Sequence, residues 1–290
     1  SISIEVRKQA LEQIERSDGI EFGLRVFKGK RQAIVSGSDL SEASIKLMTE
    51  RAVDMAKAAP EDPYCGLAKK SELVAAWDVD ELELSDDQAE PQPEELENQA
   101  KEAEYFALEN QSVDQVQSAS SAYSKTKIHL SATNGFNGGY SKTSFSTSCV
   151  AIARSQSGLE RDYDGDVRIF KRDLRSPEEI GIRAAKRAVS KLEARKPKTG
   201  VYPVIFDERV SSSLIGHLLA ATNGVAVAKG SSWLLNRKGT QVLPEFLSIT
   251  EDPFRRRASG SRPFDAEGLE TKARKIVENG VLGDWTTDLS

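Results

Sequence analysis

Residues 206 to 224 decide how the C-terminal part of this chain folds; they read Phe206-Asp207-Glu208-Arg209-Val210-Ser211-Ser212-Ser213-Leu214-Ile215-Gly216-His217-Leu218-Leu219-Ala220-Ala221-Thr222-Asn223-Gly224. Asp207 follows an apolar run from 202 to 206 and is a residue type preferred at helix N-caps. Apolar residues then recur at helical spacing, and Asn223-Gly224 is a helix stop. The stretch therefore predicts a strand, a cap and a helix. Because the run before the cap is almost continuously apolar, we expect that strand to be buried on both faces.

Further motifs lie on both sides of this stretch. Downstream they are Gly230-Ser231-Ser232-Trp233-Leu234, Ile249-Thr250-Glu251-Asp252-Pro253, Arg255-Arg256-Arg257 and Ser261-Arg262-Pro263-Phe264-Asp265-Ala266-Glu267-Gly268. Upstream they are Gly23-Leu24-Arg25-Val26-Phe27, Glu61-Asp62-Pro63-Tyr64 and Glu160-Arg161-Asp162-Tyr163-Asp164. In this order the set resembles the TldD/PmbA family, once described as modulators of DNA gyrase, over nearly the whole chain. The resemblance is closest to the PmbA (TldE) branch.

In the TldD branch, the corresponding helix carries His-Glu-x-x-x-His, which holds zinc and places a general base. A zinc hydrolase needs nitrogen donors, an open metal position and a carboxylate. Aligned on this sequence, the three motif positions are Gly216, His217 and Ala221, so neither His nor the Glu is present. The resemblance thus implies a chain without a metal site or catalytic residue of its own. His217 is interpreted as a partly buried, hydrogen-bonded helix histidine, with a lone metal ligand or general base as the alternative.

The resemblance also implies a function. It points to the metal-free subunit of a heterodimeric zinc metallopeptidase that acts on unfolded or small peptides, including antibiotic precursors. A TldD-type partner would carry the zinc, and a homodimer is the alternative in its absence. An extended peptide bound by strand addition would suit such an architecture. Two rival functions remain, a stand-alone hydrolase and a regulatory protein that contacts DNA gyrase.

Composition limits these alternatives. The 290 residues suggest about two domains, and 38% hydrophobic with 29% charged residues is ordinary for a globular protein. A net charge of −5 argues against a nucleic-acid partner. No apolar run approaches the length needed to cross a bilayer, and the N-terminus lacks the layout of a signal peptide. We therefore expect a cytoplasmic protein without a membrane partner. Cys65 and Cys149 lie too far apart in the sequence to indicate a disulfide framework or a cysteine zinc site.

Periodicity along the chain predicts an α+β fold. Alternating residues 1 to 35 predict antiparallel strands, and a long helix follows from the Asp39/Glu42 capping box to Pro60. The acidic stretch 85–93 reads as an exposed linker, and Pro93 as the start of a second helix. Strands flank a turn at 134–139, and Ser176-Pro177 begins a third helix.

The segment Lys196-Pro197-Lys198-Thr199-Gly200 is linker-like. We therefore place an N-terminal α+β domain at 1–198 and a β-rich C-terminal domain from 199 to 290. A hairpin is expected around Asn279-Gly280. The family pattern continues beyond Trp285, so we expect this domain to be incomplete here. The C-terminal end should then lie beside exposed apolar surface or an unpaired strand edge.

Charged clusters give the remaining candidates. Residues 160–166 read as a hairpin rich in turn residues, with a metal site as the alternative. The basic face of the third helix is interpreted as solvated or as a docking surface; it comprises Arg183, Lys186, Arg187 and Lys191. Arg255, Arg256, Arg257 and Arg262 form a basic cluster that either pairs with nearby acids or contacts a peptide or a partner. His129 lies on the polar face of a predicted strand and receives no catalytic role.

Overall fold

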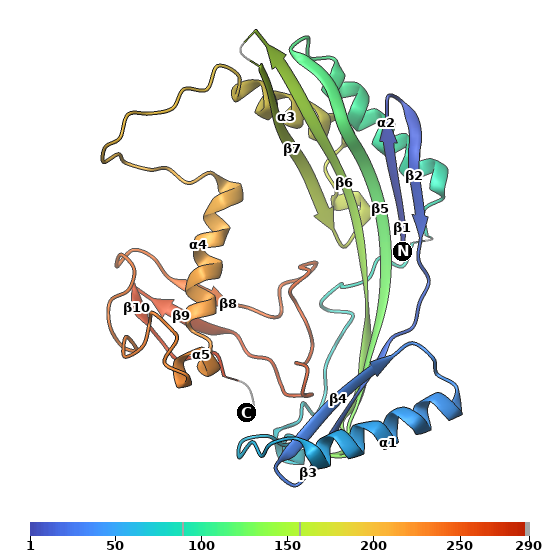
Figure 1. Ribbon diagram of the computed structural model, residues 1–290, viewed down its shortest axis with the longest axis vertical. Coiled ribbons are helices and arrows are strands. Elements are labelled where there is room, and N and C mark those ends of the chain that lie inside the picture. Colours follow the sequence, from blue (N-terminus) through green and yellow to red (C-terminus); the bar gives the residue numbers. More distant parts are fainter. Residues whose placement is uncertain (89, 157, 288–290) are drawn as a thin grey trace.

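The computed structural model describes residues 1–88, 90–156 and 158–287, and its largest unit is a five-stranded antiparallel sheet (Figure 1). The strand order is β2-β1-β5-β6-β7. These strands are β1 (Ile2–Arg7), β2 (Ala10–Arg16), β5 (Val113–Ser131), β6 (Asn137–Ser155) and β7 (Gly158–Arg168). The long β5–β6 hairpin forms the spine of the molecule (Figure 1). The antiparallel sheets and helices confirm the predicted α+β class.

Two helices cover one face of this sheet, α2 (Pro93–Leu108) and α3 (Pro177–Ser190). Their starts follow local rules: each has proline in its first turn, and the Ser176 side chain accepts a hydrogen bond from the Glu179 amide. Small residues line the contact between the helices and the sheet, so the backbones approach closely. The buried alanines there are Ala100, Ala103, Ala107, Ala184, Ala185 and Ala188.

The turn between β1 and β2 was not predicted from the sequence. Lys8 and Gln9 have φ of 55° and 58°, a left-handed conformation that favours Gly, Asn or Asp. Both backbone amides donate to the buried carboxylate of Glu104 on α2, at 2.7 and 2.6 Å. These charge-assisted hydrogen bonds satisfy the two amide groups of the turn and compensate for its unfavourable backbone conformation.

A second, two-stranded sheet with its own helix lies near the end of the long β5–β6 hairpin, away from α2 and α3 (Figure 1). Strands β3 (Phe22–Lys28) and β4 (Arg31–Gly37) pair only with each other among the described strands, and α1 (Glu42–Ala58) packs on them. The N-cap of this helix lies two residues later than the predicted N-cap, Asp39. Ser41 is the N-cap, and Asp39 accepts hydrogen bonds from the Ser41 amide and hydroxyl instead.

The C-terminal part contains α4 (Glu208–Ala221), α5 (Gly224–Ala228) and a small sheet ordered β10-β9-β8. Its strands are β8 (Ile249–Glu251), β9 (Arg274–Glu278) and β10 (Val281–Leu282), and the predicted hairpin at Asn279-Gly280 joins the last two. This sheet packs on one face of α4 and makes a separate small core, comprising Leu218, Ala221, Leu234, Ile276, Val277 and Leu282. The last residues, 288–290, on which the expectation of an open C-terminal end falls, lie outside the described residues.

The predicted strand at 202–206 is wrong. This segment has no regular secondary structure, and Ile205 is 96% exposed. It belongs to a long arc that leaves the body after α3 and returns at α4 (Figure 1). An apolar run becomes a buried strand only where a neighbouring strand satisfies its backbone and another layer covers it. None of the described residues provides either here.

Two other predictions also need correction. The acidic stretch 85–93 is only partly exposed, because Asp86 and Pro91 are buried and the Asp86 amide donates to Thr143 Oγ1. Residues 160–166 are not a hairpin but the middle of strand β7, paired with β6 along its length. The acidic residues there have the composition of a turn, but in the fold their carboxylates bind Arg175, which precedes α3, Arg187 of α3 and Arg209 of α4.

Candidate functional site

Helix α4 carries Gly216, His217 and Ala221, the three positions that the sequence predicts to correspond to the zinc motif. It begins at Glu208 because the Asp207 side chain accepts a hydrogen bond from the Arg209 amide, at 3.0 Å. Gly216 and His217 are exposed, while Ala221 is buried in the small C-terminal core. The interpretation of His217 as a partly buried residue is therefore wrong. His217 and Ala221 are four positions apart and share one side of the helix, whereas Gly216 does not lie on that side.

The donor atoms around α4 do not fit a catalytic zinc ion. Gly216 and Ala221 have no side-chain donor, and His129 lies on β5, where its ring hydrogen-bonds Asn137 at 2.8 Å. Across residues 1–88, 90–156 and 158–287, no three His, Cys, Asp or Glu side chains are grouped to hold a metal. Catalytic zinc sites in proteins use three protein ligands, commonly including histidines.

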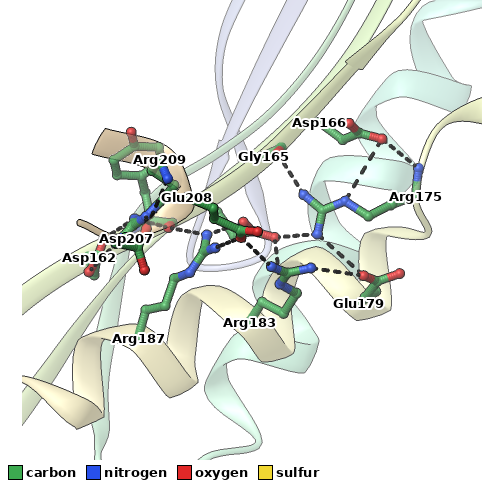
Figure 2. Close-up of polar contacts among 12 residues, drawn as sticks. Asp162, Gly165, Asp166, Arg175, Glu179, Arg183, Arg187, Asp207, Glu208 and Arg209 are labelled. Carbon is green, nitrogen blue, oxygen red and sulfur yellow. Dashed lines mark hydrogen bonds and ion pairs between the residues drawn. The ribbon is translucent and has the colours of Figure 1, made fainter. Parts of the chain in front are cut away.

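An ion-pair network connects α4 to β7 and α3 (Figure 2). Asp162 on β7 is 5% exposed and binds Arg209 of α4 through two hydrogen bonds, at 2.8 and 3.3 Å. Lys191, just after α3, lies 3.0 Å from the same carboxylate. The motif at 160–164 thus holds the first turn of α4.

The second buried carboxylate, Asp164, extends the network toward α3. It accepts a hydrogen bond from Arg175 at 2.7 Å and contacts Arg187. Arg187 also donates to Glu208 at 3.2 Å, and Arg183 donates to Glu208 at 3.1 Å (Figure 2). Arg187 therefore bridges β7 and α4. Three of the four residues on the predicted basic face bind carboxylates and are not simply solvated; Lys186 alone among these four is exposed without such a contact.

Two carboxylates of this network, Asp162 and Asp166, have lowered pKa values. Burial opposes ionisation of Asp162, but hydrogen bonds from Arg209, the Tyr163 amide and Lys191 outweigh it and hold its pKa well below the usual range. Burial likewise opposes ionisation of Asp166, and bonds from the Arg175 amide and Arg168 lower its pKa. Stability from a carboxylate with a lowered pKa is fully present above its unfolded pKa, about 3.9, and is lost as pH falls toward the folded value.

Two more contacts join motifs that are distant in sequence. Arg25 on β3 donates to Glu267 at 2.6 Å. Arg257 binds both Glu83 and Asp173, with its guanidinium 4.3 Å from the centre of the Phe170 ring. These pairs connect β3 and the segments around Glu83 and Asp173 to the chain between β8 and β9.

The basic cluster is divided by the fold. Arg256 also binds Glu83, at 2.7 Å, so Arg256 and Arg257 both pair with acids that lie far from them in the sequence. Arg255 and Arg262 have no ion pair with a described residue, and together with Arg257 they line a cavity of about 490 Å³ beside β6 and β7. Sequence spacing alone did not separate these two pairs of arginines.

We expect the ion-pair network to control how firmly α4 is held. Replacing Arg209 with glutamine should speed amide hydrogen exchange in the first turns of α4 by about tenfold, because a hydrogen-bonded charge contributes on the order of 1.5 kcal/mol. Lowering the pH below about 4 should weaken protection at the same amides, since an Asp162 carboxylate released by local opening then takes up a proton, which favours the opened state. Both are measured by hydrogen exchange with mass spectrometry.

Lys186→Gln is the matched control, because Lys186 is an exposed cation on α3 outside the network. It should leave exchange in α4 unchanged. Equal protection of α4 in the wild type and the Arg209 variant would contradict a holding role for the network.

The α+β fold described above is covered by three family matches, which together define the class of protein. Residues 1–56 match PmbA/TldA metallopeptidase domain 1, residues 86–192 match the central domain and residues 199–290 match the C-terminal domain. The chain belongs to the PmbA/TldD metallopeptidase family. This confirms the resemblance found in the sequence.

Individual relatives support the same assignment. Metalloprotease PmbA of Escherichia coli O157:H7 is 34% identical over 286 residues, which cover 98% of this chain and 63% of the relative. A crystal structure from Bacteroides thetaiotaomicron, described as a modulator of DNA gyrase, superposes with a TM-score of 0.90 at 26% identity, covering 99% of this chain and 65% of that one. TldE of Thermococcus kodakarensis shares the fold, with a TM-score of 0.80 at 19% identity over 99% of this chain and 64% of TldE.

The chain spans less than two thirds of the length of these relatives. Within its described residues, no helix is both long enough and apolar enough to cross a bilayer.

Proposed function

We propose that this chain is the metal-free subunit of a two-subunit zinc metallopeptidase that acts on unfolded or small peptides. A TldD-type subunit supplies the zinc and the general base. The present chain supplies one wall of the peptide cleft and the interface that holds the zinc-bearing subunit. Two observations support this function: membership of a metallopeptidase family, and the lack of a side-chain donor atom at Gly216 and Ala221, two of the three positions predicted to correspond to the zinc motif.

The observation that carries the proposal is the pair Gly216 and Ala221. Neither side chain has an atom that can coordinate a metal, and Ala221 is buried. These two residues therefore cannot act as ligands for a catalytic zinc ion with its bound water. His217 remains, but one exposed imidazole is a single ligand where catalytic sites use three. The rival function of a stand-alone zinc hydrolase therefore lacks the ligands it needs.

Exposed apolar side chains on α4 and on the segment before it further support pairing with another surface. Val204, Ile205, Val210, Leu214 and Ile215 are all between 41% and 96% exposed. Clustered apolar exposure of this kind is typical of surfaces that contact another protein element.

The proposal predicts complementation between two subunits. This chain alone should bind no stoichiometric zinc and should hydrolyse no peptide above background. Mixing it with a TldD-type subunit from the same organism should give a complex that contains zinc and cleaves an unfolded peptide. Metal analysis and a peptide-hydrolysis assay, each run on the separate and mixed subunits, measure both properties.

His217→Ala is the informative variant for this assay. Activity of the mixture should stay within about twofold, since surface substitutions usually change free energies by about 0.5 kcal/mol or less. The proposal fails if the chain alone holds one zinc ion per molecule and cleaves a peptide, and if alanine at position 217 abolishes both.

A further inference from the structure

The loop from 253 to 262 is folded tightly onto itself. The Arg262 amide donates to the Pro253 carbonyl at 3.1 Å, and the buried Ser261 hydroxyl donates to the Arg255 carbonyl at 2.7 Å. Arg255 and Arg262, seven positions apart in sequence, are consequently held at the same end of the loop. Their backbones are fixed before any ligand arrives, which reduces the entropy lost on binding.

Lys142 on β6 anchors this loop to the main sheet. Its ammonium group donates to the carbonyls of Ser259 and Ser261, at 2.9 Å each. Burial lowers the pKa of Lys142, and repulsion by the Arg262 guanidinium lowers it further. The positive charge of Arg262 thus lowers the pKa of a neighbouring cation, and no described carboxylate lies within ion-pair distance to neutralise it.

The cavity beside the loop holds both free and paired charges. Arg168 binds Asp166, Arg257 binds Glu83 and Asp173, and Glu251 binds Arg274, so these lining charges are neutralised. Three others among the described lining residues have no opposite charge within ion-pair distance, namely Arg255, Arg262 and Asp252. Two cations and one anion leave a single positive charge in excess.

We propose that Arg255 and Arg262 form a binding site for one carboxylate group of a peptide. Guanidinium groups bind carboxylates through paired, charge-assisted hydrogen bonds. An excess of one positive charge suits a singly charged carboxylate, whereas the Asp252 carboxylate in the same cavity repels a dianion such as phosphate. A volume of about 490 Å³ is large enough for a terminal residue with its side chain. The choice of a peptide as ligand rests on the proposed peptidase function.

The test uses three forms of one short, otherwise neutral peptide and this chain alone. One form has a free C-terminal carboxylate, one has a C-terminal amide, and one has the amide and an internal glutamate. Binding is measured by fluorescence anisotropy. The free-acid peptide should bind about tenfold more tightly than the neutral amide, the factor expected for a hydrogen bond to a charged group. Strong binding of the glutamate peptide would place the recognised carboxylate on a side chain; weak binding would place it at the C-terminus.

Arg262→Gln and Arg255→Gln should each remove about this tenfold preference. Arg256→Gln is the matched control, an exposed arginine in the same run that binds Glu83 and does not line the cavity. It should leave the preference intact. Thermal unfolding of each variant confirms that the loop's surroundings still fold.

The proposal is overturned if all three peptides bind equally, if Arg256→Gln weakens binding as much as Arg262→Gln, or if inorganic phosphate displaces the free-acid peptide more effectively than acetate does. Because no zinc subunit is present, these results are independent of hydrolysis. A failed complementation assay together with carboxylate-selective binding would reject the two-subunit peptidase and keep the site.

Discussion

Replacing Gly181 with alanine is expected to destabilise the protein by about 2–3 kcal/mol, near the upper end of the usual range for overpacking a core. Gly181 lies where α3 crosses α2. A Cβ atom there would stand 2.2 Å from the Ala103 carbonyl oxygen and 3.0 Å from the Ala107 nitrogen. Both are backbone atoms, so the clash is relieved only if the two helices separate. Urea unfolding, followed by circular dichroism, measures the change.

Gly216→Ala is the control for this substitution and should act in the opposite direction. Gly216 lies inside α4, is exposed, and would place a Cβ with nothing within 4 Å. Alanine at an exposed helix position is favoured over glycine by about 0.5–1 kcal/mol, so the free energy of unfolding should rise. Destabilisation by both substitutions to a similar extent would show that the α2–α3 contact is looser than described.

Asp164→Asn should destabilise the protein by about 3 kcal/mol, because it removes one partner from a buried ion pair. Asparagine keeps the shape of the side chain, but it leaves Arg175 and Arg187 facing a neutral amide. Asp164 is only 3% exposed, so water cannot replace the lost carboxylate. The loss should appear as a lower urea midpoint with an unchanged slope.

Asp114→Asn provides a surface comparison. Asp114 binds Arg154 through two hydrogen bonds, at 2.6 and 3.0 Å, but Arg154 is 58% exposed. Surface pairs contribute little, so the midpoint should hardly move. If the two asparagine variants unfold at the same urea concentration, the burial of Asp164 has no energetic consequence and the network is not a structural element.

The elements that were predicted correctly depend on short-range rules. The β5–β6 hairpin was visible from strict alternation, and α2 and α3 from Pro93 and from the Ser176-Pro177 cap. Each of these signals lies within a few residues of the element that it starts. The three domain matches came from the comparison with the family, and periodicity alone could not supply them.

The predictions that failed depend on distant partners. The segment 202–206 looked like a buried strand, but pairing and covering require elements that are not adjacent to it in the described structure. The turn at Lys8-Gln9 needs Glu104, far along the chain. Partners that are distant in sequence cannot be inferred from local composition.

The candidate site shows the same limitation. The carboxylates at 162 and 164 alternate along a strand, and the basic residues at 183, 187 and 191 repeat at helical spacing. Each pattern was present in the sequence and was interpreted separately, as a turn and as a solvated or docking face. Only the crossing of α3 over β7 shows that the two patterns neutralise one another.

The exposed segment Val201-Tyr202-Pro203-Val204-Ile205-Phe206 has a consequence for how the chain behaves at high concentration. Five of its six residues are apolar or aromatic with high β-propensity, and none is charged. Uncharged runs of this composition favour stacking of identical chains into fibrils. Pro203, near the middle, has no N–H to donate and interrupts such a ladder. The proline therefore acts as a gatekeeper, which lets this apolar segment remain accessible without promoting self-association.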